Sequence, residues 1–488
     1  MTREGQICVS VSARNLRELR AKRDALQDAD LVELRLDSLE DRPDVAGALK
    51  DRHRPVIVTC RPVWEGGLFA GSEDERRRLL GEALALGAEY VDIEWRAGFA
   101  DLLAQTHGKR VVLSTHDFEG VPKDLSDRAR AMSATNAEFV KIAVRANRLS
   151  DCLALLALQE SLPNQQKAIL IAMGDCGLAS RVLAERFGSS WTYAGDMAAV
   201  GQVTMDALLN LYRFRSLSAG SDVYGVVGRP VGHSVSPAMH NAGFAEIGHN
   251  AVYLPLPAAD IEDFVTFGRG IGLKGASVTI PYKVPALTIV DHADALARQV
   301  GAVNTIRVVD GLWNGYNTDV SGFLRPLSER GVDVSGARAA VLGAGGSARA
   351  VASALLRAGA DVTIHARRET AATELAECCG ARVAPWPPAQ GSWDVLVNCT
   401  PVGMHPAVEE SPMPSKALTG GLIYDLVYNP SETRLLREGA AAGCRTIGGL
   451  DMLVAQAQEQ FQLWTGHSVT AGVMRAAAEK QLSELGCQ

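Results

Sequence analysis

The stretch RVVLSTHDFEGVPKDLSDRARAMSATNAEFVKIAV, residues 110–144, contains two short apolar runs rich in β-branched residues, with a helical segment between them. RVVLSTHDF and FVKIAV are predicted strands, and the order strand, helix, strand is typical of a parallel sheet covered by helices. The same alternation extends in both directions from this unit, from residue 1 to about residue 214. The unit is therefore one repeat of a larger architecture.

Eight such runs are present in the first half, which predicts a closed parallel (β/α)8 barrel of the TIM type. They are ICVSVSA (7–13), LVELRLDS (31–38), PVIVTCR (55–61), YVDIEW (90–95), RVVLSTHDF (110–118), FVKIAV (139–144), AILIAMG (168–174) and WTYAGD (191–196). Residues 72–86 and 178–187 carry apolar side chains at three- and four-residue spacing with charges on the opposite face. They are predicted to be helices that pack outside the barrel.

Changes in composition predict where the domains meet. SLSAGSD, residues 216–222, is small and polar, and a new strand-like run, VYGVVG, follows it. GVDVSGAR, residues 331–338, precedes the run AAVLGAGG, which opens a region with its own nucleotide-binding signal. We expect the barrel at residues 1–217, a second domain at 222–334 that is completed by C-terminal helices at about 457–488, and a third domain at 335–456.

Composition favours small-molecule chemistry. The chain has 49 Lys and Arg against 56 Asp and Glu, a net charge of −7, and no basic run that would indicate binding to nucleic acid or to a membrane. Its nine cysteines lack metal-type spacing, and Cys378 and Cys379 are adjacent, so we expect free thiols, no metal site and a cytoplasmic protein. The N-terminus enters a strand-like run at once, which leaves no room for a targeting peptide, and no apolar stretch reaches membrane-spanning length.

Lys141 is the most informative residue of the first half. In a β/α barrel, the carboxyl ends of the strands form the active site, and His116 and Lys141 lie at or near two of those ends. Because a buried ammonium is costly, Lys141 in the run FVKIAV is expected to act as a neutral amine that attacks ketones. The structural alternative is an ion pair between Lys141 and Asp92 or Glu94 on the fourth strand.

The motifs ELRLD, TCR followed by EGG, LSTHDF, VKIAV and MGxxGxxSR together resemble type I 3-dehydroquinate dehydratase over the whole first half. This resemblance implies that Lys141 forms an imine with the C3 ketone of 3-dehydroquinate. It implies that His116 removes the C2 proton and later protonates the departing hydroxyl, and that Glu65 orients His116. The implied substrate-binding residues are Ser10, Glu33, Arg35, Arg61, Arg181 and Gln202. The chain departs from the family at AAVGQ, where Ala198 replaces a serine, and we expect weaker substrate binding with intact chemistry.

The second half contains a nucleotide-binding signal in AAVLGAGGSARAVASALLRAG. Gly343, Gly345 and Ala348 have G-x-G-x-x-A spacing after a β run and before a helix, which is typical of a Rossmann domain that binds a dinucleotide. The next strand, DVTIHARR, ends in Arg367 and Arg368 where NAD enzymes usually carry an acid. Two arginines can bind a 2′-phosphate, so we expect NADP rather than NAD.

The motifs GRPVGHSVSPAMHN, GASVTIPYK, GAVNTI, GYNTD, NCTPVGM, DLVYNP and GGLDMLVAQAQEQFQLWTG together resemble shikimate dehydrogenase over residues 222–480. The fold that this resemblance implies is a two-domain α/β dehydrogenase. Lys283 and Asp319 are implied to serve the reacting oxygen. The implied substrate-binding residues are Ser234, Ser236, Thr279, Asn304, Tyr428 and Gln456, and the implied cofactor-binding residues are Gly343, Ala344, Gly345, Gly346, Ser347, Ala348, Arg367, Arg368, Leu426 and Gly449. Ala366 departs from the family, which usually has asparagine there.

The two resemblances imply a bifunctional enzyme, a lyase and an NADP-dependent oxidoreductase of the shikimate pathway of aromatic amino acid biosynthesis. It would dehydrate 3-dehydroquinate to 3-dehydroshikimate and reduce that product to shikimate. Two alternatives remain: a second half that is a quinate or aminoshikimate dehydrogenase, or a non-catalytic metabolite sensor. Expected partners are these small molecules and no nucleic acid or membrane, with the chain a monomer or homodimer. Channelling between the two sites and activity on quinate are left open.

Overall fold

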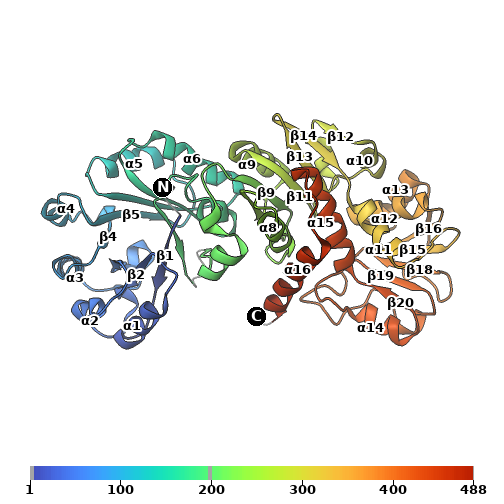
Figure 1. Cartoon of the computed structure of the whole chain (residues 1–488), viewed down its shortest axis with the longest axis horizontal. Coiled ribbons are helices and arrows are strands. Elements are labelled where there is room, and N and C mark those ends of the chain that lie inside the picture. Colours follow the sequence, from blue (N-terminus) through green and yellow to red (C-terminus); the bar gives the residue numbers. More distant parts are fainter. Residues whose placement is uncertain (1–4, 196–200, 487–488) are drawn as a thin grey trace. The chain divides into compact units, whose positions relative to one another are not determined.

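The computed structural model describes residues 5–195 and 201–486 (Figure 1). By their contacts, these residues form two compact units. The first contains the described residues up to 222 together with 257–271, and the second contains residues 223–256 together with 272–486.

The first unit is built on an eight-stranded parallel sheet in the order β7-β6-β5-β4-β3-β2-β1-β8. The strands are β1 Gln6–Val11, β2 Leu31–Arg35, β3 Val56–Thr59, β4 Tyr90–Glu94, β5 Val111–Asp117, β6 Phe139–Arg145, β7 Lys167–Met173 and β8 Trp191–Ala194. β7 and β8 meet through one parallel bridge between Ala168 and Ser189, so the barrel is nearly closed. All eight predicted runs form strands, and the predicted barrel fold is confirmed.

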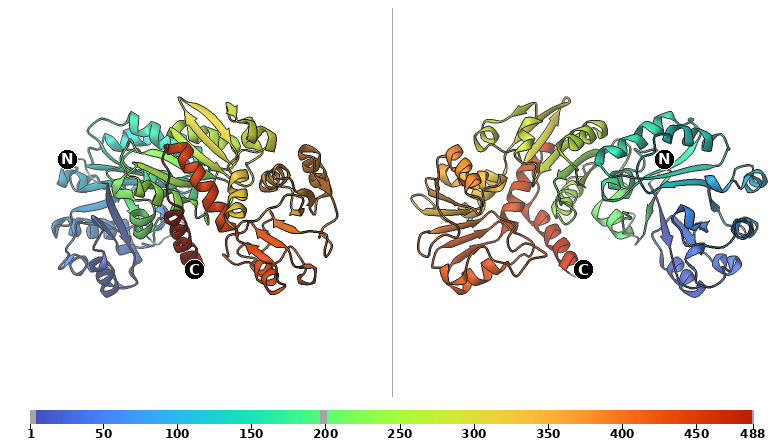
Figure 2. Two further views of the ribbon diagram at one scale, coloured as in Figure 1. Left: turned by 45° about the vertical axis from the view of Figure 1, so that its right-hand side comes forward. Right: turned by 180° about the vertical axis from the view of Figure 1, so that it is seen from behind.

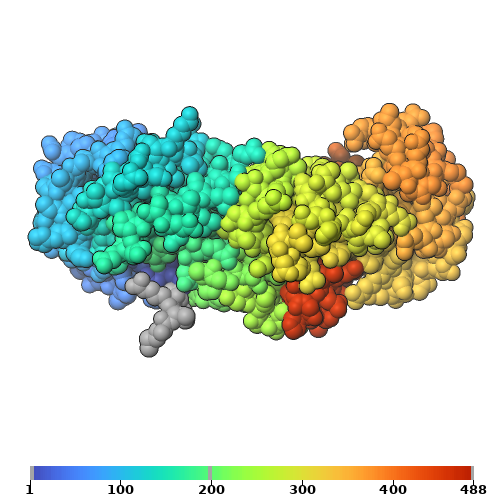
Figure 3. Space-filling view, turned by 90° about the horizontal axis from the view of Figure 1, so that it is seen from above, coloured from blue at the N-terminus to red at the C-terminus, as the bar shows by residue number. Residues whose placement is uncertain are grey.

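Helices cover the outside of this barrel, because the strands are apolar on both faces and must be shielded from water. They are α1 Leu16–Ala25, α2 Val45–Leu49, α3 Glu73–Ala85, α4 Ala100–Thr106, α5 Leu125–Ser133, α6 Cys152–Ser161 and α7 Leu178–Val182. Figure 3 shows part of the surface of this unit, coloured blue to green.

Helix α3 agrees with the predicted helix at residues 72–86. Its N-cap is Ser72, whose side chain accepts a hydrogen bond from the backbone N–H of Glu75, and acidic residues occupy its first turn. The helix predicted at 178–187 is shorter than expected, because α7 ends at Val182 and turns follow. Leu183 and Phe187 are buried all the same, so their spacing indicates burial rather than a continuous helix.

Helix α9, Ile261–Ile271, belongs by its contacts to the unit that contains the barrel. Its Asp263 is 1% exposed and accepts hydrogen bonds from the backbone N–H groups of Leu149 and Ser150, at 3.1 and 2.9 Å. These N–H groups lie at the start of the helical segment that continues into α6, where a carboxylate is stabilising.

The second unit contains two six-stranded sheets. The first is mixed and has the order β10-β9-β11-β13-β14-β12, with β11 parallel to β9 and antiparallel to β13. Its strands are β9 Asp222–Val227, β10 Ala251–Leu256, β11 Leu273–Val278, β12 His292–Ala293, β13 Thr305–Val309 and β14 Leu312–Tyr316, and helices α8 Ser236–Glu246, α10 Ala295–Val300 and α11 Asp319–Glu329 accompany them.

The second sheet is parallel and has the order β17-β16-β15-β18-β19-β20. This order, with the first strand of the domain at its centre, is that of the Rossmann fold, so the predicted dinucleotide-binding architecture is confirmed. Its strands are β15 Arg338–Leu342, β16 Asp361–His365, β17 Arg382–Val383, β18 Val395–Asn398, β19 Leu422–Asp425 and β20 Arg445–Ile447; its helices are α12 Gly346–Arg357, α13 Glu369–Cys379 and α14 Arg434–Ala441.

The chain then returns to the mixed sheet through α15 Gly449–Thr465 and α16 Ala471–Gly486. Both helices lie beside α8, as Figures 1 and 2 show in red and green. Phe461 and Trp464 of α15 and Met474 of α16 share a buried core with Phe244 of α8 and Tyr224 of β9. Within residues 5–195 and 201–486, no helix combines the length and the apolar character that crossing a membrane requires.

Candidate active sites

A cavity of about 110 Å³ lies among residues of the barrel strands and the loops that follow them. It brings together all nine residues that the sequence assigned to the first site: Ser10, Glu33, Arg35, Arg61, Glu65, His116, Lys141, Arg181 and Gln202. They come from positions 10 to 202 of the chain, and the barrel places them together because parallel strands have their carboxyl ends at the same rim.

Lys141 lies in the middle of β6, 5% exposed, between two carboxylates. Its Nζ is 3.1 Å from Oδ2 of Asp92 and 3.5 Å from Oε1 of Glu33. The expected neutral amine stays a prediction. The ion pair with Asp92, weighed as the structural alternative, is present, and both carboxylates are acceptors within reach of the lysine proton.

His116 lies at the end of β5 and contacts Glu65. Oε1 of Glu65 accepts from the backbone N–H of His116 at 2.7 Å and lies 3.4 Å from Nδ1 of its ring. Burial, with the positive charges of Arg61 and Lys141, lowers the pKa of His116 well below its ordinary value. The imidazole is therefore neutral at pH 7, the state that a general base requires.

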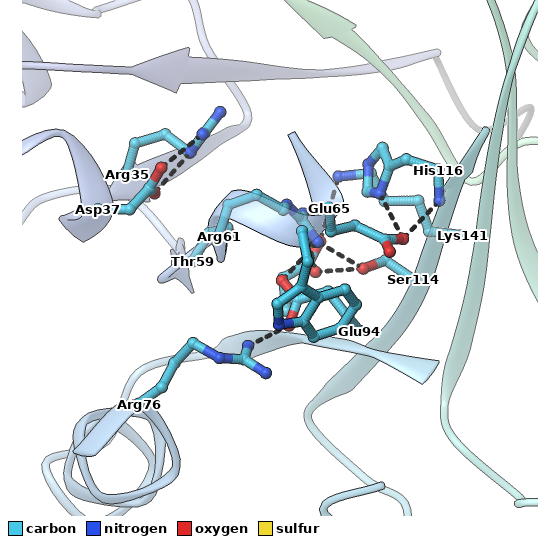
Figure 4. A network of polar contacts seen from close by, with 12 residues as sticks. Arg35, Asp37, Thr59, Arg61, Glu65, Arg76, Glu94, Ser114, His116 and Lys141 are labelled. Carbon is cyan, nitrogen blue, oxygen red and sulfur yellow. Dashed lines mark hydrogen bonds and ion pairs between the residues drawn. The ribbon is translucent and has the colours of Figure 1, made fainter. Parts of the chain in front are cut away.

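Three arginines line the cavity in different ways. Arg61 is 4% exposed and is bound by Oδ1 of Asp92 at 2.9 Å and Oε1 of Glu94 at 2.7 Å. Although burial opposes it, the charges of Arg61 and Lys141 hold the pKa of Asp92 below its usual range. Arg35 forms a two-point ion pair with Asp37 on the other side of the cavity (Figure 4).

The third, Arg181 of α7, is 3% exposed, and burial lowers its pKa to about 10. It therefore remains a cation at neutral pH, and a buried guanidinium in this cavity suits an anionic ligand group.

Asp92, which the sequence placed on the fourth strand near Lys141, and two aromatic residues that the sequence did not assign also belong to this site. Asp92 binds both Lys141 and Arg61, the ring of Tyr193 lies 4.2 Å from Nζ of Lys141, and Phe118 lines the cavity. The polar residue Asp92 inside the run YVDIEW was a signal for its role, whereas an aromatic residue in a buried strand carries no such signal. Ala198, where the sequence departs from the family, lies outside the described residues.

In the second unit, Lys283 and Asp319 form a close ion pair of Nζ and Oδ2 at 2.5 Å. Their side chains are 11% and 6% exposed. Asp319 begins α11, and its other oxygen, Oδ1, accepts from Asn304 at 2.8 Å. The predicted catalytic pair and the predicted ligand Asn304 are therefore in contact.

Among the other predicted substrate residues, Ser234 contacts both Ser236 and Tyr428. Ser234 precedes α8, shares a hydrogen bond with Tyr428 and accepts from the backbone N–H of Ser236 at 3.3 Å. Thr279 follows β11, and its methyl group packs where a Cβ on Gly228 would stand. Gln456 lies on α15, 7% exposed, and its side-chain amide donates to the carbonyl of Leu453.

The glycine loop fits a dinucleotide. Gly343 has φ of 106°, a backbone conformation that L side chains rarely adopt, and helix α12 begins at Gly346. A Cβ on Gly346 would stand 2.8 Å from the Lys283 side chain, so the helix N-terminus and the catalytic pair are adjacent. Ser347 Oγ lies 3.2 Å from Nζ of Lys283. The N-terminus of a helix whose backbone N–H groups a ligand can approach closely is suited to bind a pyrophosphate.

The remaining predicted cofactor residues follow the carboxyl ends of strands of the parallel sheet. Arg367 and Arg368 follow β16 and are exposed. Leu426 follows β19, and a Cβ on Gly449 would stand 2.3 Å from the Leu426 carbonyl, so the glycine permits this contact. In open α/β sheets, ligands bind beyond these carboxyl ends.

Comparison with known families agrees with this division of the chain. Residues 7–219 match the family described as type I 3-dehydroquinase. Residues 226–306 match the shikimate dehydrogenase substrate binding domain, and residues 449–479 match the shikimate 5'-dehydrogenase C-terminal domain.

Individual relatives extend the comparison. A shikimate dehydrogenase (NADP(+)) of Moorella thermoacetica is 42% identical, covering 53% of this chain and 92% of the relative. The crystal structure of shikimate 5-dehydrogenase from Thermus thermophilus, in complex with NADP(H) and shikimate, is 38% identical with a TM-score of 0.50 and covers 53% of this chain and 99% of its own.

One relative spans both halves. The bifunctional 3-dehydroquinate dehydratase/shikimate dehydrogenase of Arabidopsis thaliana, named as chloroplastic, is 37% identical over 475 residues. The alignment covers 90% of this chain and 78% of that relative. With a barrel and a Rossmann-type unit in one chain, each matched by its own family, the protein belongs to the family of bifunctional 3-dehydroquinate dehydratase/shikimate dehydrogenases.

Proposed function

We propose that the barrel converts 3-dehydroquinate to 3-dehydroshikimate through an imine on Lys141. The observation that carries this proposal is the cavity in which Lys141, His116 and Arg181 are found together. A buried amine, a neutral imidazole and a buried cation are the groups that imine formation, proton removal and carboxylate binding need.

The residues of the cavity account for each proton. The Lys141 amine adds to the C3 carbonyl and water leaves, which gives a protonated imine; the lysine proton passes first to Asp92 or Glu33. His116 takes the C2 proton, because the imine draws the electron pair of that C–H bond. The same electron pair then expels the C1 hydroxyl, which leaves as water with the proton from His116. Hydrolysis of the imine frees the product and restores Lys141.

The second half, in our proposal, reduces 3-dehydroshikimate to shikimate. NADPH would be held by the loop at Gly343–Ala348 and by Arg367 and Arg368, and when bound it supplies a hydride to the substrate ketone. Lys283 donates a proton to the oxygen that becomes a hydroxyl, and Asp319 orients the lysine and stabilises its charge. The relatives of Moorella thermoacetica and Methanopyrus kandleri that match this half are named as shikimate dehydrogenases, which supports shikimate over quinate or aminoshikimate as the product.

We further propose that the chain acts in the cytoplasm, as a monomer or homodimer. The eight cysteines of the described residues form no disulfide with one another, which suits a reducing compartment. Size-exclusion chromatography with light scattering would measure the oligomeric state.

One assay tests both reactions. The purified chain is mixed with 3-dehydroquinate and NADPH, and absorbance of the reduced cofactor is followed. Oxidation requires both sites in series, and we expect it with NADPH well above NADH. Lys141→Ala should abolish oxidation from 3-dehydroquinate and preserve it from 3-dehydroshikimate, whereas Lys283→Met should abolish both. No oxidation by the wild-type chain from either substrate would refute the proposal.

A further inference from the structure

Arg76 is a buried cation on the outside of the barrel that neither reaction uses. It lies in the first turn of α3, yet its side chain is 0% exposed. Taking a guanidinium out of water is costly unless its donors are satisfied, so its partners indicate what it does. Its charged partners are Glu94 and Glu73, and its guanidinium also lies 4.7 Å from the centre of the Phe99 ring.

One side of Arg76 leads to the substrate cavity. Its Nη1 binds Oε2 of Glu94, and the other oxygen of Glu94 accepts from Nη1 of Arg61 at 2.7 Å. Figure 4 shows the three side chains in this order, from the helix that carries Arg76 toward the site. Glu94 is completely buried, and burial raises its pKa. The guanidinium groups of Arg61 and Arg76 oppose this effect of burial, and each binds one oxygen of the carboxylate.

The other side of Arg76 leads to the general base. Its Nη2 is 2.5 Å from Oε2 of Glu73, whose second oxygen accepts from the indole N–H of Trp64 at 3.0 Å. The guanidinium also lies 5.7 Å from the centre of the Trp64 ring. Trp64 belongs to the short helical turn η2, Val63–Glu65, which ends in the carboxylate that contacts His116.

We propose that Arg76 is a positioning residue of the dehydratase, which holds Arg61 through Glu94 and the turn that carries Glu65 through Glu73 and Trp64. It touches no substrate atom in this role. The proposal rests on the proposed dehydratase function. It adds a residue of a helix outside the barrel to the residues that position the active site.

A purely structural role makes a different prediction. If Arg76 only stabilised the fold, its removal would lower the melting temperature and leave the kinetics of the folded enzyme unchanged. If it positions both groups, KM rises because Arg61 is less well held, and kcat falls because Glu65 no longer fixes His116. The acid limb of the pH profile should also move upward. Glu94, which faces Arg61, Asp92 and Arg76, loses one cation and is protonated at higher pH.

The test compares Arg76→Met and Arg76→Lys with Arg77→Met, a control at the next position, where the arginine is half-exposed and paired with Asp101. Dehydratase kcat, KM and pH profile are measured by formation of the conjugated ketone. The dehydrogenase activity of the same preparation measures the amount of chain, and the melting temperature shows whether the barrel is folded. We expect kcat/KM of Arg76→Met to fall by about 10- to 100-fold, Arg76→Lys to recover part of the loss, and Arg77→Met to stay within twofold of wild type.

If Arg76→Met does not fold, the kinetics of Arg76→Lys and Trp64→Leu test the proposal instead. Trp64 is 42% exposed, so its replacement leaves the core intact. Trp64→Leu should lower kcat at least threefold. The proposal is overturned if the folded variants keep kcat, KM and pH profile within twofold of wild type. A wild-type chain without dehydratase activity would instead refute the function on which the proposal rests.

Discussion

Removal of the Lys283 ammonium should disable the dehydrogenase and leave the dehydratase unchanged. Lys283→Met deletes one partner of a pair whose Nζ and Oδ2 atoms are 2.5 Å apart and whose side chains are 11% and 6% exposed. Truncating one member of such a buried pair costs about 3–5 kcal/mol, and a positioned proton donor contributes roughly 10²–10⁴-fold to a rate. We therefore expect kcat for 3-dehydroshikimate to fall by about 10²–10⁴-fold.

Asp319→Asn should cost less, about 10- to 100-fold, because the lysine remains and keeps its contact with Ser347 at 3.2 Å. The double variant should be little worse than Lys283→Met alone, since the two groups act as a unit. The assay is NADPH oxidation with 3-dehydroshikimate, and Lys274→Met, an exposed lysine on β11, is the control. The dehydratase activity of each preparation measures the amount of chain, and the melting temperature shows whether the second unit is folded. A Lys283→Met enzyme within threefold of wild type would refute the reasoning.

Three further results are expected. Burial and neighbouring cations depress the pKa of His116, so its neutral form persists in acid. The acid limb of dehydratase kcat/KM should therefore lie well below pH 6.5. Inactivation with a midpoint at or above pH 6.5 would contradict this. Replacing both Arg367 and Arg368 with alanine should raise KM for NADPH at least about tenfold and change KM for NADH little, whereas an equal rise for both cofactors would argue against binding of the 2′-phosphate. Gly343→Val should lower both the melting temperature and the affinity for NADPH. The reason is that φ at this position is 106° and the new Cβ would stand 3.1 Å from the side chain of Thr400. An unchanged melting temperature would show that the loop can adapt.

Much of the fold could be predicted because it depends on local pattern. A parallel strand buried on both faces has to be apolar along its length, so each of the eight runs was visible in isolation. The first half of the helix at 178–187 was also visible, but its end was not. Leu183 and Phe187 are buried in turns, and apolar spacing reports burial without reporting whether the backbone continues as a helix.

The first site could be predicted in its members but not in its contacts. His116 and Lys141 were identified by their place in strands and by resemblance, and both line the cavity. The sequence allowed Lys141 to pair with Asp92 or Glu94; in the structure it pairs with Asp92 and Glu33, while Glu94 binds Arg61 and Arg76. These pairings depend on how neighbouring strands are aligned in the barrel, because the alignment sets which side chains lie at the same level. The sequence of a single strand does not contain this information.

By itself, the sequence determined the two α/β architectures and the glycine loop that suits a dinucleotide, and it named candidate residues for each reaction. The architectures and the loop follow from periodicities of a few residues, whereas most of the candidate residues came from resemblance to known families. Only the tertiary structure decided that Arg76, which in the sequence is one of several charges on an amphipathic helix, is completely buried against Glu94. The physical reason is that a helix sequence specifies which face is polar, whereas the packing of that helix on the barrel determines which polar side chain is removed from water and must find a partner.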